Sequence, residues 1–382
     1  NFASGNVVVL NRAIQILGAG SGVTTLQMSN FPERLTIRDI PAGQELRLSG
    51  FTLDLGLWGG GGSSFGLEII DCQGAVFLGD LVEAPGNPGL TSLSMSATDA
   101  DLVVIEGCAF AGRSWQGDCG NPGPKSIPAV RAVASTLFIH DSTFDGGFNQ
   151  DGCFVQVGVA GLELEDSVAY VSDSFLEGWR GGATLSGWSI GYQAIDLLGD
   201  SQVTLIGSTV VKGGDGPSSA GGSGLVLLAG DVVVATPDVV FQPGTDLGGG
   251  TTAPSVSNQG GQLTILTERW TTTTVSLHQV APGGSFSLAH GGAPSATVVP
   301  FFSTGMATAI PVLPGVLGRV LIDLSAANQL APQTLDSGGS ALSSIAVPSV
   351  PALIGLGVLF QTVGASPSGT YSLSNASMVS VH

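Results

Sequence analysis

Basic side chains, and charge in general, are scarce in this chain. Its 382 residues include 11 Lys and Arg against 29 Asp and Glu, and only 10% of residues are charged, where an average domain has roughly 25%. Binding to nucleic acid needs basic side chains clustered on one face. The net charge of −18 therefore predicts no nucleic-acid partner.

Long apolar runs are also lacking. The longest candidate, Val347 to Val363, is interrupted by Pro348, Pro351 and two glycines, and a membrane helix needs roughly 18 or more apolar residues. We therefore expect no membrane span. No signal peptide is visible ahead of Asn1, which predicts a processed or truncated N-terminus. The acidic, lysine-poor and glycine-rich composition favours a secreted or cell-surface protein.

The chain does have a repeated block. The segments LVVIEGCAF, LFIHDSTF, AYVSDSF and VTLIGSTV recur at steps of 34, 32 and 34 residues when they are aligned on Cys108, Ser142, Ser174 and Ser208. A second apolar strand precedes each copy. Such a period indicates a solenoid, in which each repeat buries its apolar face by stacking on its neighbours.

The predicted fold class is all-β, with a right-handed parallel β-helix followed by a small antiparallel β-sandwich. The helix is predicted over residues 1–250, a linker or last irregular coil over 251–262, and the sandwich over 263–382. We expect the sandwich to cap one end of the rod, because an open solenoid end exposes unpaired strand edges.

Two adjacent positions of the repeat predict which side chains point inward. One position is aliphatic in every copy, with Ile105, Ile139, Val171 and Leu205. The position before it is mixed, with Val104, Phe138, Tyr170 and Thr204. Successive strand residues face opposite sides, so we expect the aliphatic set to form an internal ladder. A second internal stack is expected from Phe110, Phe144 and Phe175.

Three stretches resemble a group of secreted bacterial proteins, best known from planctomycetes and related phyla. They are RAIQILGAGSGVTTLQM (Arg12 to Met28), the repeated strand–Asp/Gly–Ser/Cys–x–Phe–x–Gly block, and the tail from LGRVLIDLSAANQL to YSLSNASMVSV. Those proteins carry a right-handed parallel β-helix of the pectate-lyase-like superfamily, followed by a β-rich C-terminal module. The resemblance implies this fold and assigns no activity.

Catalytic patterns of polysaccharide-cleaving β-helices are missing. The chain has no Asp-Asp pair, no Gly-His-Gly and no Arg-x-Lys, so no catalytic residues are predicted. The neighbouring acids Glu165 and Asp166 should face opposite sides of a strand, and we interpret them as a solvated turn. His140 aligns with residues as different as Glu106, Ser172 and Ile206, which indicates a slot at the surface.

A ligand-binding site is predicted at Trp115, Glu177, Trp179, Arg180 and Trp188. Exposed tryptophans can stack on sugar rings, and Arg180 can pair with a uronate carboxylate. The alternative interpretation is that these aromatic side chains cover the flank of the rod.

The even number of cysteines predicts two disulfides among Cys72, Cys108, Cys119 and Cys153. The expected bridge is Cys108–Cys119 or Cys119–Cys153, with Cys72 in the second bridge or free. No zinc spacing is present, so no metal site or cofactor is predicted. Acidic turns at Asp99/Asp101 and Asp215 leave a structural Ca²⁺ open.

Two functions from different classes remain. The leading hypothesis is a non-catalytic extracellular structural protein, a cell-surface or filament subunit that self-associates head-to-tail. The alternative is a secreted polysaccharide-binding or polysaccharide-degrading β-helix protein. An enzyme should show a groove, a concave flank with clustered acids and an Arg or Lys, and this feature separates the two hypotheses.

Overall fold

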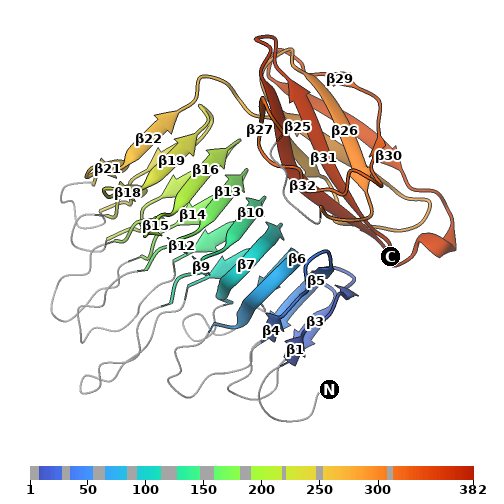
Figure 1. Ribbon diagram of the computed structural model, residues 1–382, viewed down its shortest axis with the longest axis horizontal. Helices are drawn as coiled ribbons and strands as arrows, with labels where there is room; N and C mark the ends of the chain where they lie inside the picture. The colour runs from blue at the N-terminus through green and yellow to red at the C-terminus, as the bar shows by residue number, and fades with distance from the viewer. Residues whose placement is uncertain are drawn as a thin grey trace.

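Stacked coils of parallel strands form a right-handed β-helix, and two further sheets follow it in the chain (Figure 1). The computed structural model describes residues 8–27, 35–54, 65–83, 93–112, 127–146, 159–180, 191–216, 221–246, 253–307 and 313–382. Each coil contains up to three strands separated by tight turns, and the strands pair in register with those of the next coil. The predicted all-β fold class is confirmed.

Three strand series run along the helix. The first series is β1 (Val8–Leu10), β4 (Leu35–Arg38), the first parts of β6 (Leu67–Glu83) and β7 (Met95–Glu106), then β9 (Val130–Val133), β12 (Leu162–Glu165), β15 (Ile195–Leu198), β18 (Leu225–Leu227) and β21 (Val256–Asn258). The second series is β2 (Gln15–Leu17), β5 (Glu45–Asp54), the later parts of β6 and β7, then β10 (Thr136–His140), β13 (Val168–Ser172), β16 (Gln202–Ile206), β19 (Val232–Ala235) and β22 (Gln262–Ile265). The third series begins with β3 (Thr25–Gln27) and the ends of β5 and β6. It continues as a sheet of β8 (Ala109–Ala111), β11 (Thr143–Asp145), β14 (Phe175–Glu177), β17 (Val210–Lys212) and β20 (Val240–Gln242).

The predicted aliphatic ladder lies inside the helix. Ile105, Ile139, Val171 and Leu205 are register partners on successive coils and are at most 1% exposed. Phe110 and Phe144 stack with ring centroids 5.8 Å apart. The third member of that stack is Leu176, which pairs with Phe144. The prediction of Phe175 was therefore wrong by one residue, and Phe175 pairs instead with Thr143.

The turns explain why glycine and aspartate alternate in the repeat. Gly107, Asp141, Asp173 and Gly207 all have left-handed backbone conformations, with φ values of 60°, 47°, 48° and 62°. Most side chains clash in that region, whereas Gly and Asp tolerate it. The turn between the first and second strands uses Ala134, Asp166 and Gly199 in the same way.

Hydroxyl side chains continue the stacking through the turns. The amide N–H of Cys108 donates to Ser142 Oγ, that of Ser142 to Ser174 Oγ, and that of Ser174 to Thr209 Oγ1. The fourth repeat therefore aligns on Thr209, and the predicted alignment on Ser208 was one residue short. Ser208 is an extra, exposed turn residue whose N–H donates to Asp173.

The two cysteines that the structure describes are free. Cys72 and Cys108 are buried thiols, so the predicted Cys108–Cys119 bridge was wrong. Cys72 was predicted to be either in the second bridge or free, and it is free. Burial raises the pKa of Cys108 to about 12, which keeps it an uncharged core side chain. The other candidates, Cys119 and Cys153, lie outside the described residues.

Two sheets make up the C-terminal module. One contains β23 (Thr272–Val275), β25 (Ser285–Gly291) and β30 (Ser340–Ala346). The other contains β24 (Gln279–Val280), β26 (Thr297–Ser303), β27 (Val316–Leu317), β28 (Asn328–Gln329), β29 (Gln333–Thr334), β31 (Gly357–Ala365) and β32 (Tyr371–Val381). A 3₁₀ helix, η1 (Pro351–Leu353), follows β30. Side chains from both sheets share one core, which includes Phe286, Leu288, Phe360 and Val379.

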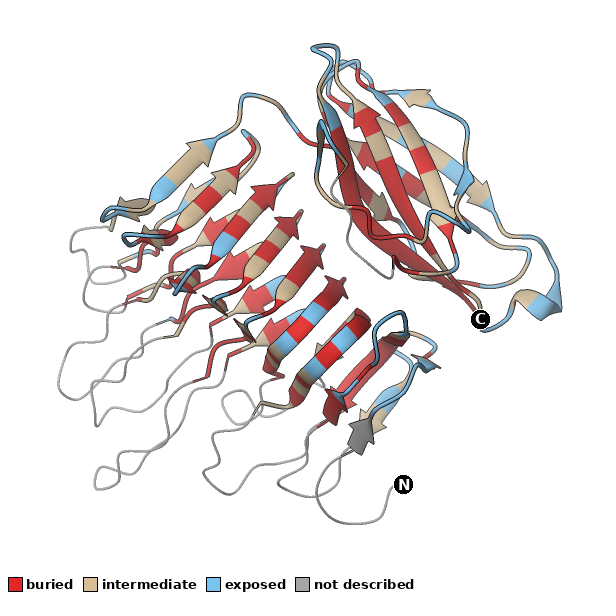
Figure 2. Cartoon of the chain, in the orientation of Figure 1, coloured by how far each residue is buried: buried red, intermediate tan, exposed pale blue. Residues whose placement is uncertain are grey.

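The module lies along the flank of the helix, so the prediction that it caps an end was wrong (Figure 1). Phe77, Val104, Phe138 and Tyr170 form the outward column of the second strand series. They pack against the module, including Met378. Figure 2 shows this flank and the facing strand β32 as buried. Buried apolar area of this kind is the main stabilising term in docking two surfaces.

The last coil consists of β21 and β22. Among the described residues each of these strands pairs only with a strand of the preceding coil, and Ile265 remains 52% exposed. The parallel pairing continues to Ile265, three residues past the predicted boundary between residues 262 and 263.

Polar contacts anchor the module beside this apolar column. The fully buried Arg47 donates to the carbonyl oxygens of Gly357 and Thr304 at 3.1 and 2.6 Å, and it forms an ion pair with Glu45 at 2.6 Å. The carboxylate of Glu106 accepts the amide N–H of Met378 at 2.7 Å. Burial raises the pKa of Glu106 to about 7.

The repeat position of His140 was predicted to lie at the surface, and this prediction was wrong. Glu106, His140, Ser172 and Ile206 are register partners and are at most 6% exposed. They point outward from the helix, but the module covers them. The mixed character of the position arises because it contacts different groups of the module.

We expect Ile139→Ala to lower the free energy of unfolding by about 2–5 kcal/mol, because it removes buried methyl groups and leaves a cavity. Leu198→Ala, at a partly exposed aliphatic side chain of a nearby coil, should cost roughly 0.5 kcal/mol. Urea unfolding of both variants measures the difference. Equal losses would mean that Ile139 is not in the core.

We expect Glu106→Gln to stabilise the protein at high pH only. The folded-state pKa of about 7 lies above the ordinary value of 4.5, so the native chain loses stability as the pH rises between these values. Glutamine does not titrate, so the variant should gain up to about 3 kcal/mol above pH 7 and nothing below about pH 4.

Urea unfolding across this pH range tests the Glu106 prediction, with Glu165→Gln as a control on the same helix because Glu165 is partly exposed. A difference between native chain and Glu106→Gln that does not change with pH would contradict it.

Candidate functional site: an acidic face of the helix

The outward face of the first strand series carries a cluster of charged side chains. Arg131 on β9, Glu163 on β12 and Asp196 on β15 are register partners on three successive coils. Strand β12 reads Leu-Glu-Leu-Glu, and its leucines are buried inside the helix while Glu163 and Glu165 face outward. The period of two along the strand therefore places both glutamates on the same face.

Arg131 links the two glutamates. Its Nε lies 3.0 Å from Glu163 Oε1 and its Nη2 lies 2.8 Å from Glu165 Oε2. The side chain of Glu163 is 17% exposed, against 40% for Arg131 and 39% for Glu165. Glu163 is thus the most enclosed of the three, at the centre of the cluster.

Two carboxyl groups of the cluster hold their protons more tightly than usual. Burial raises the pKa of Glu163 although Arg131 opposes it, and the negative charge of Asp196 adds to the rise. Burial also raises the pKa of Asp196. The hydroxyl of Tyr192 lies 3.5 Å from Asp196 Oδ2, and burial beside this carboxyl raises the pKa of Tyr192.

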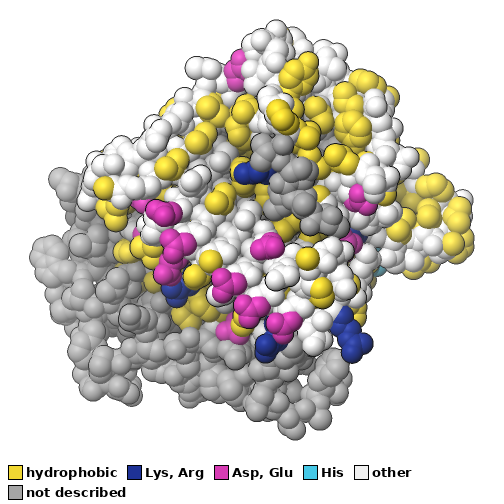
Figure 3. All heavy atoms as spheres, in the orientation of Figure 1, with side chains coloured by type: hydrophobic (Ala, Val, Ile, Leu, Met, Phe, Trp, Pro, Cys, Tyr) yellow, Lys and Arg dark blue, Asp and Glu magenta, His cyan; other side chains and the backbone are white. Residues whose placement is uncertain are grey.

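Such an arrangement suits proton transfer at a bound substrate. Partners on adjacent strands are about 4.8 Å apart, so Glu163 and Asp196 present two carboxyl groups side by side. Acid–base chemistry on a sugar needs one carboxyl group that is protonated and one that is ionised. Figure 3 shows further acidic side chains in a band across this face of the molecule.

The predicted binding residues form a separate cluster on the third strand series. Glu177 is 2% exposed and lies 2.5 Å from Arg180 and 2.8 Å from Lys212. Arg180 also lies 3.5 Å from Asp145, and Lys212 lies 3.4 Å from Asp215. The structure therefore brings Glu177 and Arg180 together as an ion-pair network.

Trp179 does not offer its ring to a ligand, because the side chain is only 1% exposed. For this residue the structure agrees with the alternative interpretation, in which the aromatic ring packs against the helix. The remaining members of the predicted set, Trp115 and Trp188, lie outside the described residues, and their role stays a prediction.

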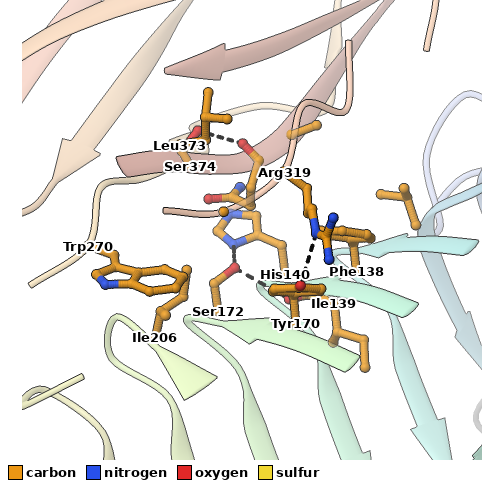
Figure 4. Close-up of a pocket in the computed structure, with 14 residues that line it drawn as sticks. Phe138, Ile139, His140, Tyr170, Ser172, Ile206, Trp270, Arg319, Leu373 and Ser374 are labelled. Atoms are coloured by element: carbon orange, nitrogen blue, oxygen red, sulfur yellow. Dashed lines mark hydrogen bonds between the residues drawn. The ribbon is translucent and has the colours of Figure 1, made fainter. Parts of the chain in front are cut away.

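A small pocket lies between the helix and the module (Figure 4). His140 and Ser172 face each other across a 2.9 Å contact, and the other ring nitrogen of His140 lies 3.2 Å from Thr274 Oγ1. Burial lowers the pKa of His140 to about 4, so the imidazole is neutral. Tyr170 accepts a hydrogen bond from Arg319 at the rim. The module buries His140 and Ser172, and the contact of His140 with Thr274 helps to hold the module against the helix.

Among the described residues, no three His, Cys, Asp or Glu side chains gather as a metal site would require. Asp215, one of the predicted calcium candidates, instead contacts Lys212 and accepts the amide N–H of Thr245. In the same described part of the chain, no helix has the length and apolar character needed to cross a membrane.

Neither a protein-family model nor a curated protein matches the sequence. Three solved structures show distant similarity. The sporulation control protein Spo0M of Bacillus subtilis is 11% identical with a TM-score of 0.18, and the match covers 31% of this chain and 50% of that one.

The other two are tailspike structures. The enzymatically active domain of tailspike protein 2 from bacteriophage CBA120 is 11% identical with a TM-score of 0.25, and the match covers 98% of this chain and 71% of that one. The full-length tailspike protein 2 from the Escherichia coli O157:H7 bacteriophage CAB120 is 12% identical with a TM-score of 0.25, and the match covers 96% and 57%. The chain thus spans only part of each of the three proteins. At such TM-scores the similarity supports no functional argument.

The sequence contains a signal for Arg131, Glu163 and Asp196, although none of the three was predicted as a site residue. The steps from Arg131 to Glu163 and from there to Asp196 are 32 and 33 residues, close to the period of the repeat. Combined with the Leu-Glu-Leu-Glu alternation, this spacing places the three side chains in one outward column. The adjacent pair Glu165–Asp166 drew attention instead, and Asp166 indeed lies in a turn.

We expect Arg131→Ala to raise the pKa of Glu163 further above its ordinary value, because the positive charge that opposes the effect of burial is lost. A carbon-detected NMR titration of the glutamate carboxyl groups measures this change. Arg38→Ala is the matched control, since Arg38 pairs with Asp39 on another coil. An unchanged or lower pKa of Glu163 would contradict the prediction.

Proposed function

We propose that this protein is an extracellular polysaccharide-binding β-helix protein that hydrolyses glycosidic bonds on its acidic face. The observation that carries the proposal is the register pair Glu163–Asp196, two outward carboxyl groups on adjacent coils that both have raised pKa values. The cluster also includes Arg131, so it combines acids with an Arg, which is one part of the feature expected of an enzyme.

The surroundings of the two carboxyl groups differ, and this difference assigns their roles. Glu163 forms an ion pair with Arg131, which favours its ionised form, so it would attack the anomeric carbon. Burial and the negative charge of Asp231 raise the pKa of Asp196, and it would donate its proton to the leaving oxygen. A strand spacing of about 4.8 Å is close to the carboxyl separation of about 5 Å in retaining glycosidases, so we expect retention of configuration.

A neutral polysaccharide fits this face better than an acidic one. Three basic side chains on the outside of the helix already contact carboxylates, namely Arg131, Arg180 and Lys212. A uronate would have to displace these partners, so the predicted pairing of Arg180 with a uronate is not favoured. Repulsion by the acidic band would add to this cost.

One observation supports the leading hypothesis from the sequence, a non-catalytic structural subunit. In the described part of the chain, strands β21 and β22 of the last coil pair only with the preceding coil, and Ile265 is 52% exposed. Head-to-tail filament assembly and self-association stay predictions, as does an extracellular location. The described cluster of acids with raised pKa values makes the polysaccharide-active function the better supported of the two.

The test uses Glu163→Gln and Asp196→Asn, with Asp200→Asn as a matched control because Asp200 is an exposed acid four residues further along the chain. On a panel of neutral polysaccharides we expect new reducing ends from the native chain. Each site variant should reduce the rate by about 10²-fold or more, as for loss of a general acid or base, while the control keeps it. No product and no binding with any polysaccharide would rule out the proposal.

A further inference from the structure

Strand β30 is an open edge of the C-terminal module. It is the terminal strand of the three-stranded sheet β23–β25–β30 and pairs with β25 alone among the described strands. Asp336 already bonds the backbone N–H and C=O of Ser340 at the start of β30. Beyond Ser340, the opposite side of the strand presents backbone N–H and C=O groups that another strand can pair with. Natural proteins usually protect such an edge with lysines, prolines, bulges or a short length.

None of these protections is present within β30. Its seven residues, Ser-Ala-Leu-Ser-Ser-Ile-Ala, contain no charge and no proline, and they pair with β25 without a bulge. The absence of charge extends well beyond the strand, because residues 337–382 contain no Asp, Glu, Lys or Arg. All 29 acidic residues lie before that segment.

The exposed face of this region is also apolar. Leu342 in the middle of β30 is 69% exposed, and Val350 and Ile354 beyond the strand are 46% and 59% exposed. Figure 3 shows hydrophobic side chains gathered at the protruding end of the module, where Figure 1 places the segment between β30 and β31. The open edge is therefore continuous in sequence with an exposed apolar patch.

We propose that β30 docks against β30 of a second copy of this chain, antiparallel about a two-fold axis, so that two three-stranded sheets join into one. The charge distribution favours a second copy as the occupant. A chain with a net charge of −18 repels its copies over most of its surface, whereas residues 337–382 let two copies approach without like charges meeting.

The sequence of β30 is compatible with this symmetry. An axis at Ser343, the middle residue of the strand, places Leu342 opposite the partner's Ser344 and diagonal to the partner's Leu342. Diagonal neighbours on one face of a sheet lie about 7–8 Å apart, within reach of long side chains. Each Leu342 would then cover the other, which removes both exposed leucines from water.

Sedimentation equilibrium of the native chain should show a concentration-dependent dimer. Leu342→Lys should weaken the association by at least 10-fold, because it places two like charges beside the axis. Leu277→Lys is the matched control, since Leu277 is 50% exposed on the same module but outside β30. Leu342 is not part of the acidic face, so hydrolysis by the monomeric variant should be unchanged.

A mixture of Leu342→Lys and Leu342→Glu chains tests the symmetry. Opposite charges across the axis should restore a heterodimer that neither variant forms well alone. A native chain that stays monomeric at every concentration, or a Leu277→Lys effect equal to that of Leu342→Lys, would overturn the proposal. Failure of the mixture to re-associate, or filaments of unlimited length in electron micrographs, would contradict the two-fold contact. Filaments would indicate a head-to-tail contact instead.

Discussion

In-register stacking of the coils is the constraint on which the rest of this structure depends. Each position of the repeat becomes a column of side chains about 4.8 Å apart, so a residue's neighbours are set by its place in the repeat. The Ile139 column fills the interior, the Phe138 column packs against the C-terminal module, and the Glu163 column lies on the outer face of the first strand series. The core, the docking surface and the candidate site are thus three columns of side chains produced by the same in-register stacking.

The docking surface shows what this constraint demands of a solenoid. An outward column with Phe138 and Tyr170 would expose aromatic rings to water if nothing covered it, and the module supplies the cover. Directional contacts then fix its position, since Arg47 and Glu106 hold backbone groups of the module in places where an unpaired charge would be costly. The apolar column stabilises the docking of the module on the helix, and the buried polar groups fix the position of the module along the helix.

The interior and the turns could be predicted from the sequence because they depend on local alternation and backbone sterics. The Ile105 ladder and the Gly/Asp turns are of this kind. The position of the module could not, because Phe138 and Met378 are 240 residues apart and no repeat relates them. The aromatic side chains at an outward position were nevertheless a sign that something covers them. Glu163 and Asp196 were predictable in principle, since repeat spacing and strand alternation together place them in one column.

The hydroxyl ladder in the turns gives the helix a direction. Ser174 accepts the amide N–H of Ser142 from the preceding coil, while its own hydroxyl donates to the carbonyl of Ser172 within its coil. The backbone of the same turn adds a bond in the opposite direction, because the amide N–H of Phe175 donates to the carbonyl oxygen of Ser142 on the preceding coil. Each turn is thus bonded to both neighbouring coils, so loss of a coil from either end of the helix leaves a buried amide N–H without an acceptor.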